Sequence, residues 1–325
     1  MNEWFGLLAI LAGAAVVGAA LGAMAALPAS SRLLSDSLTP ATRCRRVELL
    51  ALLPLGGALL GITALLLPAL LKLIGVIDDH CLEHGLHHPH FCLRHLPEFS
   101  PGLLSTGILL LIAFPIAALS RIVADGFAQG RLIRAMQRMA GTRRVLIKAE
   151  TETPQAFVFG LRRPHIVLST GLLRVLTPAE RRAVVRHEIA HARAADPIRG
   201  LLLDLALTMH LPAARASLQR CWRQAIEERA DDAVAAEGHG LALASALVRW
   251  LRLGQGRQSR TIRPEPHALA ANAGNVSHRI RRLAAGRQEV PGSAWFERLL
   301  AAGASFLVLV LTGAHHSIET LVGWL

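Results

Sequence analysis

The sequence predicts a multi-pass α-helical membrane protein with four spans and a cytoplasmic α+β domain between spans three and four. Hydrophobic residues make up 52% of the chain and charged residues only 18%, whereas an ordinary soluble domain is about 25% charged. Uncharged apolar runs near 20 residues recur, and such runs are typical of membrane spans. The net charge of +12 comes almost wholly from arginines, which gather beside these runs. This composition excludes a disordered chain and a small disulfide scaffold.

The four predicted spans come first. Residues 5–27 and 49–71 carry no charge, residues 102–119 are followed closely by arginine, and residues 299–314 form the shortest run. The first run is too long for a signal peptide and lacks a positive charge before it, so we expect a retained span. The first two spans contain GxxxG spacings. Because glycine- and alanine-rich helices contain this spacing by chance, it predicts no particular contact here.

The arginines orient the spans. The loop at residues 76–101 holds one arginine against four acidic residues, whereas the first loop and residues 121–298 are rich in arginine. The positive-inside rule therefore places the first loop and residues 121–298 in the cytoplasm and both termini outside. The predicted units are residues 1–123 with three spans, residues 124–298 as the cytoplasmic domain, and residues 299–325 with the last span and a short outer tail.

A basic, apolar chain of this kind suits the anionic cytoplasmic face of a membrane, with membrane lipid as one partner. We expect no direct binding of nucleic acid, because the arginines cluster at membrane edges and no recognition motif is present.

The cytoplasmic domain changes from strand to helix along the chain. Proline and glycine separate the expected strands, which are residues 145–149, 156–159 and 165–169. A capping box at Thr177 and Glu180 begins the central helix, which we expect to end near Ala195 because Pro197 follows. The helices expected are residues 127–139, 178–195, 201–211, 214–237 and 241–253. The first of these is either a membrane-surface helix or a solvated one, and residues 254–272 are expected to form an exposed loop.

The motif His187-Glu188-Ile189-Ala190-His191 lies within the capped helix. Because the two histidines are four residues apart, both imidazoles leave the same face and can hold one Zn²⁺. Glu188 is then placed to take a proton from a metal-bound water and pass it to a leaving amine. The sequence therefore predicts zinc-dependent peptide hydrolysis.

A catalytic zinc usually has three protein ligands, and Glu227 is the candidate for the third. Asp231 follows Glu227 by one turn and can orient a ligand histidine, as can Asp196 just beyond the active helix. A solvated acidic face is the competing interpretation of this acidic run.

These segments together resemble the M56 family of integral-membrane metallopeptidases, which includes the BlaR and MecR antibiotic sensor-transducers. The resemblance covers residues 143–235, and the arrangement of spans covers most of the rest. It implies a zincin-like, gluzincin-type zinc endopeptidase in which His187, His191 and Glu227 bind zinc and Glu188 is the acid/base. The segments that carry it are Ala156-Phe157, Gly160, Pro164-His165-Ile166-Val167-Leu168, Leu176-Thr177-Pro178-Ala179-Glu180, His187-Glu188-Ile189-Ala190-His191, Asp196, Glu227 and Asp231-Asp232-Ala233-Val234.

The resemblance also implies a function. In that family an extracytoplasmic signal activates the cytoplasmic protease, which cuts itself or a DNA-binding repressor. The antibiotic sensors carry a penicillin-binding domain after the fourth span. Because this sequence ends at Leu325, we expect a trigger other than β-lactam acylation and hypothesise a winged-helix repressor as substrate. A housekeeping membrane protease for quality control and a non-catalytic metal receptor or transporter are the alternatives.

The predicted outer loop concentrates imidazoles and thiols: His80, Cys81, His84, His87, His88, His90, Cys92 and His95. These groups suit a second Zn²⁺ or copper, so the loop is a candidate metal sensor. A disulfide between the two cysteines beside a polar cap, or a proton sensor, are the other interpretations.

The chain contains no tyrosine, although many zinc peptidases steady the oxyanion with that residue. A histidine, an arginine or a backbone N–H must replace it, and His210 is one candidate. An edge strand within residues 156–169 is expected to hold the substrate in an extended form.

Overall fold

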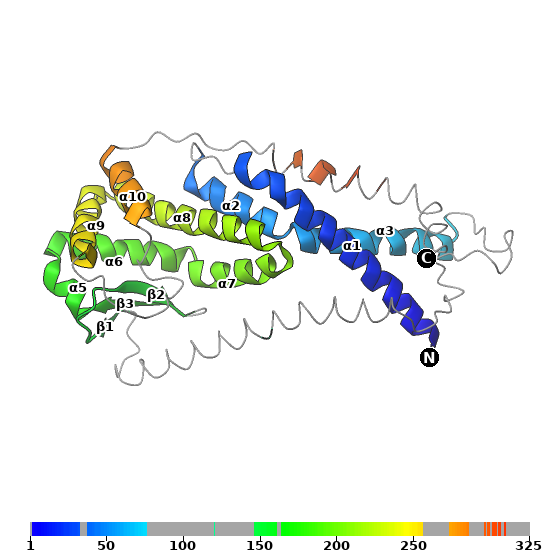
Figure 1. The fold of residues 1–325 in the computed structure, drawn as a ribbon, viewed down its shortest axis with the longest axis horizontal. Helices are drawn as coiled ribbons and strands as arrows, with labels where there is room; N and C mark the ends of the chain where they lie inside the picture. The colour runs from blue at the N-terminus through cyan, green and yellow to red at the C-terminus, as the bar shows by residue number, and fades with distance from the viewer. Residues whose placement is uncertain are drawn as a thin grey trace.

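The computed structural model describes residues 2–32, 38–76, 120, 146–160, 164–255 and 273–285, with single positions and short pieces between 296 and 309. The described part is elongated (Figure 1), with a mixed helix-and-sheet body at one end and two long helices, α1 and α3, extending from the other.

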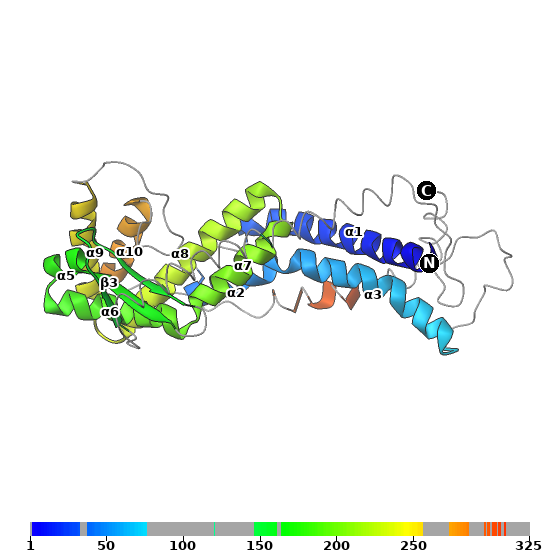
Figure 2. The ribbon, with the colours of Figure 1, turned by 90° about the horizontal axis from the view of Figure 1, so that it is seen from below.

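The two long helices cross at glycines. Helix α1 (Asn2–Arg32) lies beside α3 (Leu53–Leu73), as Figures 1 and 2 show. A Cβ atom added at Gly18 would overlap the backbone carbonyl of Gly57, and the reverse also holds, so the backbones touch there. Gly22 and Gly61 meet the opposite backbone in the same way. The GxxxG spacings, to which the sequence alone gives little weight, therefore do mark a helix contact, because only glycine permits this approach.

The segment between these helices is not a loop. Residues Pro40–Ala51 form helix α2, which Thr39 caps by accepting a hydrogen bond from the backbone N–H of Thr42. Its apolar face packs against α8, where Leu50, Ala51, Leu218 and Trp222 share one core. Our second span was therefore placed too early, since Leu49–Ala51 belong to α2. The chain turns at Leu52, with Pro54 in the first turn of α3.

One helix among the described residues, Leu53–Leu73, is long and apolar enough to cross a membrane. Only 22% of its most apolar stretch is buried, so it is unlike the core helix of a soluble protein. In α1 the apolar helix found is the shorter Leu11–Ala26. The four-span prediction is thus not confirmed. The third predicted span lies outside the described residues, and the fourth is described only at scattered positions.

The sheet has three strands in the order β1-β3-β2. Strand β1 (Leu146–Ala149) pairs with β3 (His165–Ser169) in parallel, and β2 (Ala156–Phe159) pairs with β3 antiparallel. All three match predicted strands, with Val145 outside the described residues. Apolar side chains on one face of the sheet pack on the helices, in a core that includes Val158, Ile166, Leu168, Val184, Val234 and Leu243.

Helix α5 (Thr170–Val175) follows the sheet and was not predicted. Helix α6 (Pro178–Arg193) begins at the predicted capping box, in which Thr177 and Glu180 exchange hydrogen bonds. It ends two residues before the predicted Ala195, because Ala195 adopts the left-handed conformation with φ of 55°. This turn starts α7 (Asp196–Ala206) earlier than predicted, with Pro197 in its first turn.

A short 3₁₀ turn, η3 (Leu207–Met209), ends this part, so our single helix over residues 201–211 was wrong in its bounds. The last elements are α8 (Pro212–Ala236), α9 (Gly240–Gln255) and α10 (Ala273–Ala285). The first two agree with prediction within two residues, and α10 was not predicted. The predicted helix at residues 127–139 and the loop at 256–272 lie outside the described residues.

The glycine crossing gives a prediction with a built-in control. Gly57→Ala should destabilise the chain by about 1–3 kcal/mol, since the new methyl group overlaps the α1 backbone. Gly56→Ala, one residue away, meets nothing within 4 Å and should be neutral or stabilising by up to about 1 kcal/mol. Thermal unfolding of both variants in detergent tests this. Equal unfolding midpoints would contradict the contact.

Candidate metal centre

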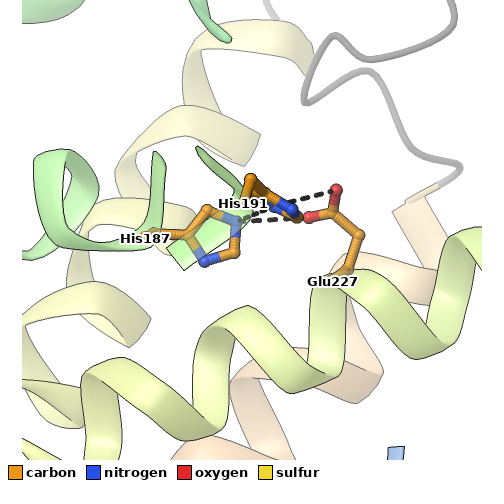
Figure 3. A group of neighbouring side chains, drawn as sticks. All are labelled: His187, His191 and Glu227. Carbon is orange, nitrogen blue, oxygen red and sulfur yellow. Dashed lines mark hydrogen bonds and ion pairs between the residues drawn. The ribbon is translucent and has the colours of Figure 1, made fainter. Parts of the chain in front are cut away.

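Two helices supply the predicted metal ligands. Helix α6 carries His187 and His191 one turn apart, and α8 crosses it with Glu227 facing both (Figure 3). The capping box fixes where α6 starts, and Ala183 and Val184 bury its inner face against the sheet. The local sequence therefore positions the two imidazoles on α6. The Glu227 carboxylate reaches them because α8 packs across α6.

The three ligand groups form a compact triangle. Nε2 of His187 lies 3.1 Å from Nε2 of His191 and 3.4 Å from Oε2 of Glu227, and His191 Nε2 lies 3.7 Å from Oε1 of Glu227. Ligand atoms about 2.0–2.1 Å from a tetrahedral Zn²⁺ would lie about 3.3 Å apart. In addition, the buried Oε2 of Glu227 makes no hydrogen bond of good geometry. The three residues therefore fit a zinc ion, and they form the His/Glu group that the structure offers for a metal within its described part.

Each histidine has a carboxylate behind it. Nδ1 of His191 lies 2.8 Å from Oδ2 of Asp196, and Nδ1 of His187 lies 3.1 Å from Oδ1 of Asp231. The hydrogen bond to Asp196 holds the Nδ1 proton of His191, so that its Nε2 is left for a metal, and Asp231 faces the corresponding atom of His187. Both predicted orienting residues are thus placed as expected, one behind each ligand.

Glu188 sits beside the triangle on α6 and is 3% exposed. Burial raises the pKa of its carboxyl, and the nearby histidines only partly oppose this effect. A raised pKa makes the carboxylate a stronger base, which suits a general acid/base. Its environment therefore agrees with the predicted role.

Arg279 of α10 is the residue that sequence reasoning missed. Its Nη1 lies 2.6 Å from Oε2 of Glu227, and its Nε and Nη2 each lie 2.7 Å from the Asp231 carboxylate. It is 1% exposed, and neighbouring Arg282 binds the Glu228 carbonyl and Asp232. The sequence gives no local signal for this contact, because Arg279 is one arginine among many and is 48 positions from Asp231.

The buried charges of the site compensate one another. Burial alone would raise the pKa values of Glu227 and Asp231, but Arg279 and the histidines hold both well below their usual range. Burial would lower the pKa of His187, yet the Asp231 and Glu227 carboxylates in contact with the ring raise it to about 9. The buried carboxylates of the site therefore depend on the cationic side chains around them.

His210 is not part of this site. Its Nε2 lies 3.1 Å from the carbonyl oxygen of Ala51 in α2, and the side chain is buried there. We therefore withdraw it as a candidate oxyanion donor. The outer-loop residues from His80 to His95 lie outside the described residues, so their role stays a prediction.

The charge balance predicts how Arg279→Met will behave. Removing one partner of a buried ion pair costs about 3–5 kcal/mol, so the metal-free variant should unfold at a clearly lower temperature. Zn²⁺ supplies the missing positive charge, so the difference in unfolding temperature between the variant and the parent chain should become smaller when Zn²⁺ is present. Thermal unfolding in Zn²⁺ and in a chelator measures both effects.

Arg281→Met is the matched control, because Arg281 is exposed and bonds only to the Ser277 carbonyl of its own helix within the described part of the chain. If Arg279→Met unfolds like the parent chain in chelator, or if Zn²⁺ leaves the difference unchanged, the proposed charge balance is wrong.

Comparison with known proteins supports this assignment at the level of a broad class. Residues 129–259, less than half of the chain, match peptidase family M48. No curated protein and no solved structure matches the chain. The M56 resemblance is therefore not confirmed, and the family match is to a different peptidase family. The matched segment runs from before β1 to the end of α9 and includes His187, His191 and Glu227. Match and geometry together support a metallopeptidase domain of the zincin type in this chain.

Proposed function

We propose that the chain is a zinc-dependent endopeptidase anchored in a membrane. The observation that carries the proposal is the convergence of His187, His191 and Glu227, with Glu188 beside them. When bound, zinc would polarise the scissile carbonyl and acidify a water molecule.

The residues of the chain have separate tasks in this proposal. His187, His191 and Glu227 hold the metal, and Asp196 and Asp231 orient the histidines. Glu188 removes a proton from the attacking water and returns it to the leaving amine. Strand β2 lies at an edge of the sheet beside α6 and can align an extended peptide by main-chain hydrogen bonds.

Glu188→Gln tests the chemistry. The variant keeps the size of the side chain but replaces one carboxylate oxygen with an NH₂ group and cannot accept the proton, so peptide cleavage should fall by at least about 100-fold. Cleavage of an unfolded protein by the purified full chain with Zn²⁺ is the measurement, and equal Zn²⁺ binding shows that the site is intact. Unchanged cleavage would exclude Glu188 as the acid/base, whereas a parent chain that binds Zn²⁺ but cleaves nothing would favour the non-catalytic receptor or transporter.

The exposed apolar helix α3 supports membrane anchoring. Because α2 packs against α8, the segment between α1 and α3 lies on the same side as the peptidase domain. The arginine distribution favours the cytoplasm for that side. We therefore propose a bacterial-type inner-membrane protein with a cytoplasmic catalytic domain.

We further propose that proteolysis transmits an extracytoplasmic signal. On this hypothesis the enzyme cuts a cytoplasmic winged-helix repressor, itself, or both, when a metal ion such as Zn²⁺ or copper binds the outer loop. The M56 resemblance supports this view, whereas the M48 match alone is equally compatible with membrane quality control. A housekeeping enzyme would cleave many unfolded proteins without any signal. Signal-independent cleavage therefore distinguishes quality control from signalling.

The sensor hypothesis has its own test. Replacing the six outer-loop histidines (80, 84, 87, 88, 90 and 95) with alanine should abolish signal-dependent cleavage, because the loop loses its imidazole ligands. Basal cleavage of an unfolded protein should persist, since the catalytic residues are untouched. Cleavage of the repressor in cells exposed to Zn²⁺ or copper is the readout, and an unchanged response would exclude the loop as sensor.

A further inference from the structure

A carboxylate far from the HExxH helix in sequence is linked to the metal centre. Glu48 lies on α2, between the two long helices. Its Oε1 accepts hydrogen bonds from Arg199 Nη2 at 2.6 Å, from Arg199 Nε at 3.0 Å and from the indole N–H of Trp222 at 3.0 Å. Both Glu48 and Arg199 are about two-thirds or more shielded from solvent. This is a partly buried, three-donor contact rather than an exposed surface pair.

The other end of Arg199 reaches the residue behind a metal ligand. Its Nη1 lies 3.3 Å from Oδ1 of Asp196, whose Oδ2 lies 2.8 Å from Nδ1 of His191. An unbroken chain of contacts therefore runs from α2 through α7 to the ligand on α6. Asp196 is 3% exposed, so its carboxylate depends on these partners rather than on water.

Glu48 controls how much of Arg199 is available to Asp196. Two nitrogens of the guanidinium face Glu48, which leaves only Nη1, at the longer distance, for Asp196. Asp196 also receives Arg229 Nη2 at 2.6 Å. Without Glu48, Arg199 is free to turn fully onto Asp196 or out to solvent. Either movement changes the hydrogen bonding and direction of the carboxylate that orients His191.

We propose that Glu48 is a positioning residue for His191 and couples the helix next to the membrane to the metal centre. Helix α2 meets the apolar helix α3 at Leu52, so a displacement of α3 is passed to Glu48 with one bend between them. Glu48 lies outside the matched segment 129–259. The inference rests on the proposed function in one respect, namely that His191 binds the metal.

Glu48→Ala in the full chain tests the proposal. The dissociation constant for Zn²⁺, measured by competition with a chromophoric chelator, should rise about 10-fold, at the low end of the effect of a direct orienting partner. For the cleavage of a protein substrate, kcat should fall while KM changes less than about twofold. In Glu48→Gln, which still accepts hydrogen bonds but lacks the charge, the Zn²⁺ affinity should lie between those of Glu48→Ala and the parent chain. Unchanged Zn²⁺ affinity in Glu48→Ala would overturn the proposal.

A charge swap separates positioning from simple attachment of α2. In Glu48→Arg with Arg199→Glu the ion pair between α2 and α7 is restored, but the carboxylate at position 199 now faces Asp196 and repels it. We expect the swap to recover the unfolding midpoint lost in Glu48→Ala but not the Zn²⁺ affinity. Recovery of both would show that attachment of α2 alone sets the Zn²⁺ affinity, and the proposal would fail.

Glu152→Gln is the matched control. Glu152 pairs with Arg174 at 2.6 Å, the same distance as the closest Glu48–Arg199 contact, and neither residue touches the metal centre. Zn²⁺ affinity and kcat should equal those of the parent chain. The parent chain distinguishes the two proposals: if it binds no Zn²⁺, the proposed function fails, whereas Zn²⁺ binding that is equal in the parent chain and Glu48→Ala removes only the role of Glu48.

Discussion

The burial of carboxylates around two histidines is the constraint on which this structure depends. Glu188, Glu228, Asp196 and Asp231 are each at most 3% exposed. Taking a carboxylate out of water costs several kcal/mol unless a cation compensates, so each group that stays ionised here needs a partner. Arg279 comes from α10 and Arg43 from α2, the latter bound to Glu228. Both arginines lie outside the matched segment, so the charge balance of the peptidase domain requires residues on either side of that segment.

Helix α8 connects the two halves of the protein. Its first half, with Leu218 and Trp222, packs in one core with α2, and its last turns, with Val234, pack in the core of the sheet. Glu227 lies between these two cores. A change in how α2 sits against α8 therefore acts close to the third metal ligand as well as on Glu48. This arrangement gives a physical route between α3 and the metal centre without requiring any large movement of the catalytic domain.

The sequence allowed the locally determined features to be predicted, but not the distant contacts. The spacing of His187 and His191, the capping box at Thr177 and the three strands follow from short-range rules, and all are present. Glu227 and Asp231 were candidates from their spacing on one helix, but a solvated acidic face was the competing interpretation, because such faces are common in solvated helices. Arg279 and Glu48 carry no local pattern at all, since their roles arise only when helices far apart in sequence pack together. The GxxxG spacings were undervalued for the same reason.

The arginines of α2 also change how the strong basic charge is interpreted. Arg43 is buried against Glu228, and Cζ of Arg46 lies 5.2 Å from the ring centroid of Phe296. These two side chains were counted as members of a basic loop facing the cytoplasm. They instead help to attach α2 to the peptidase domain. The arginines of α2 and those of the domain therefore cannot be counted as two independent indications of topology. Packing of α2 on α8 nevertheless requires both to lie on one side of any membrane, which is a stricter constraint than a statistical bias in charge.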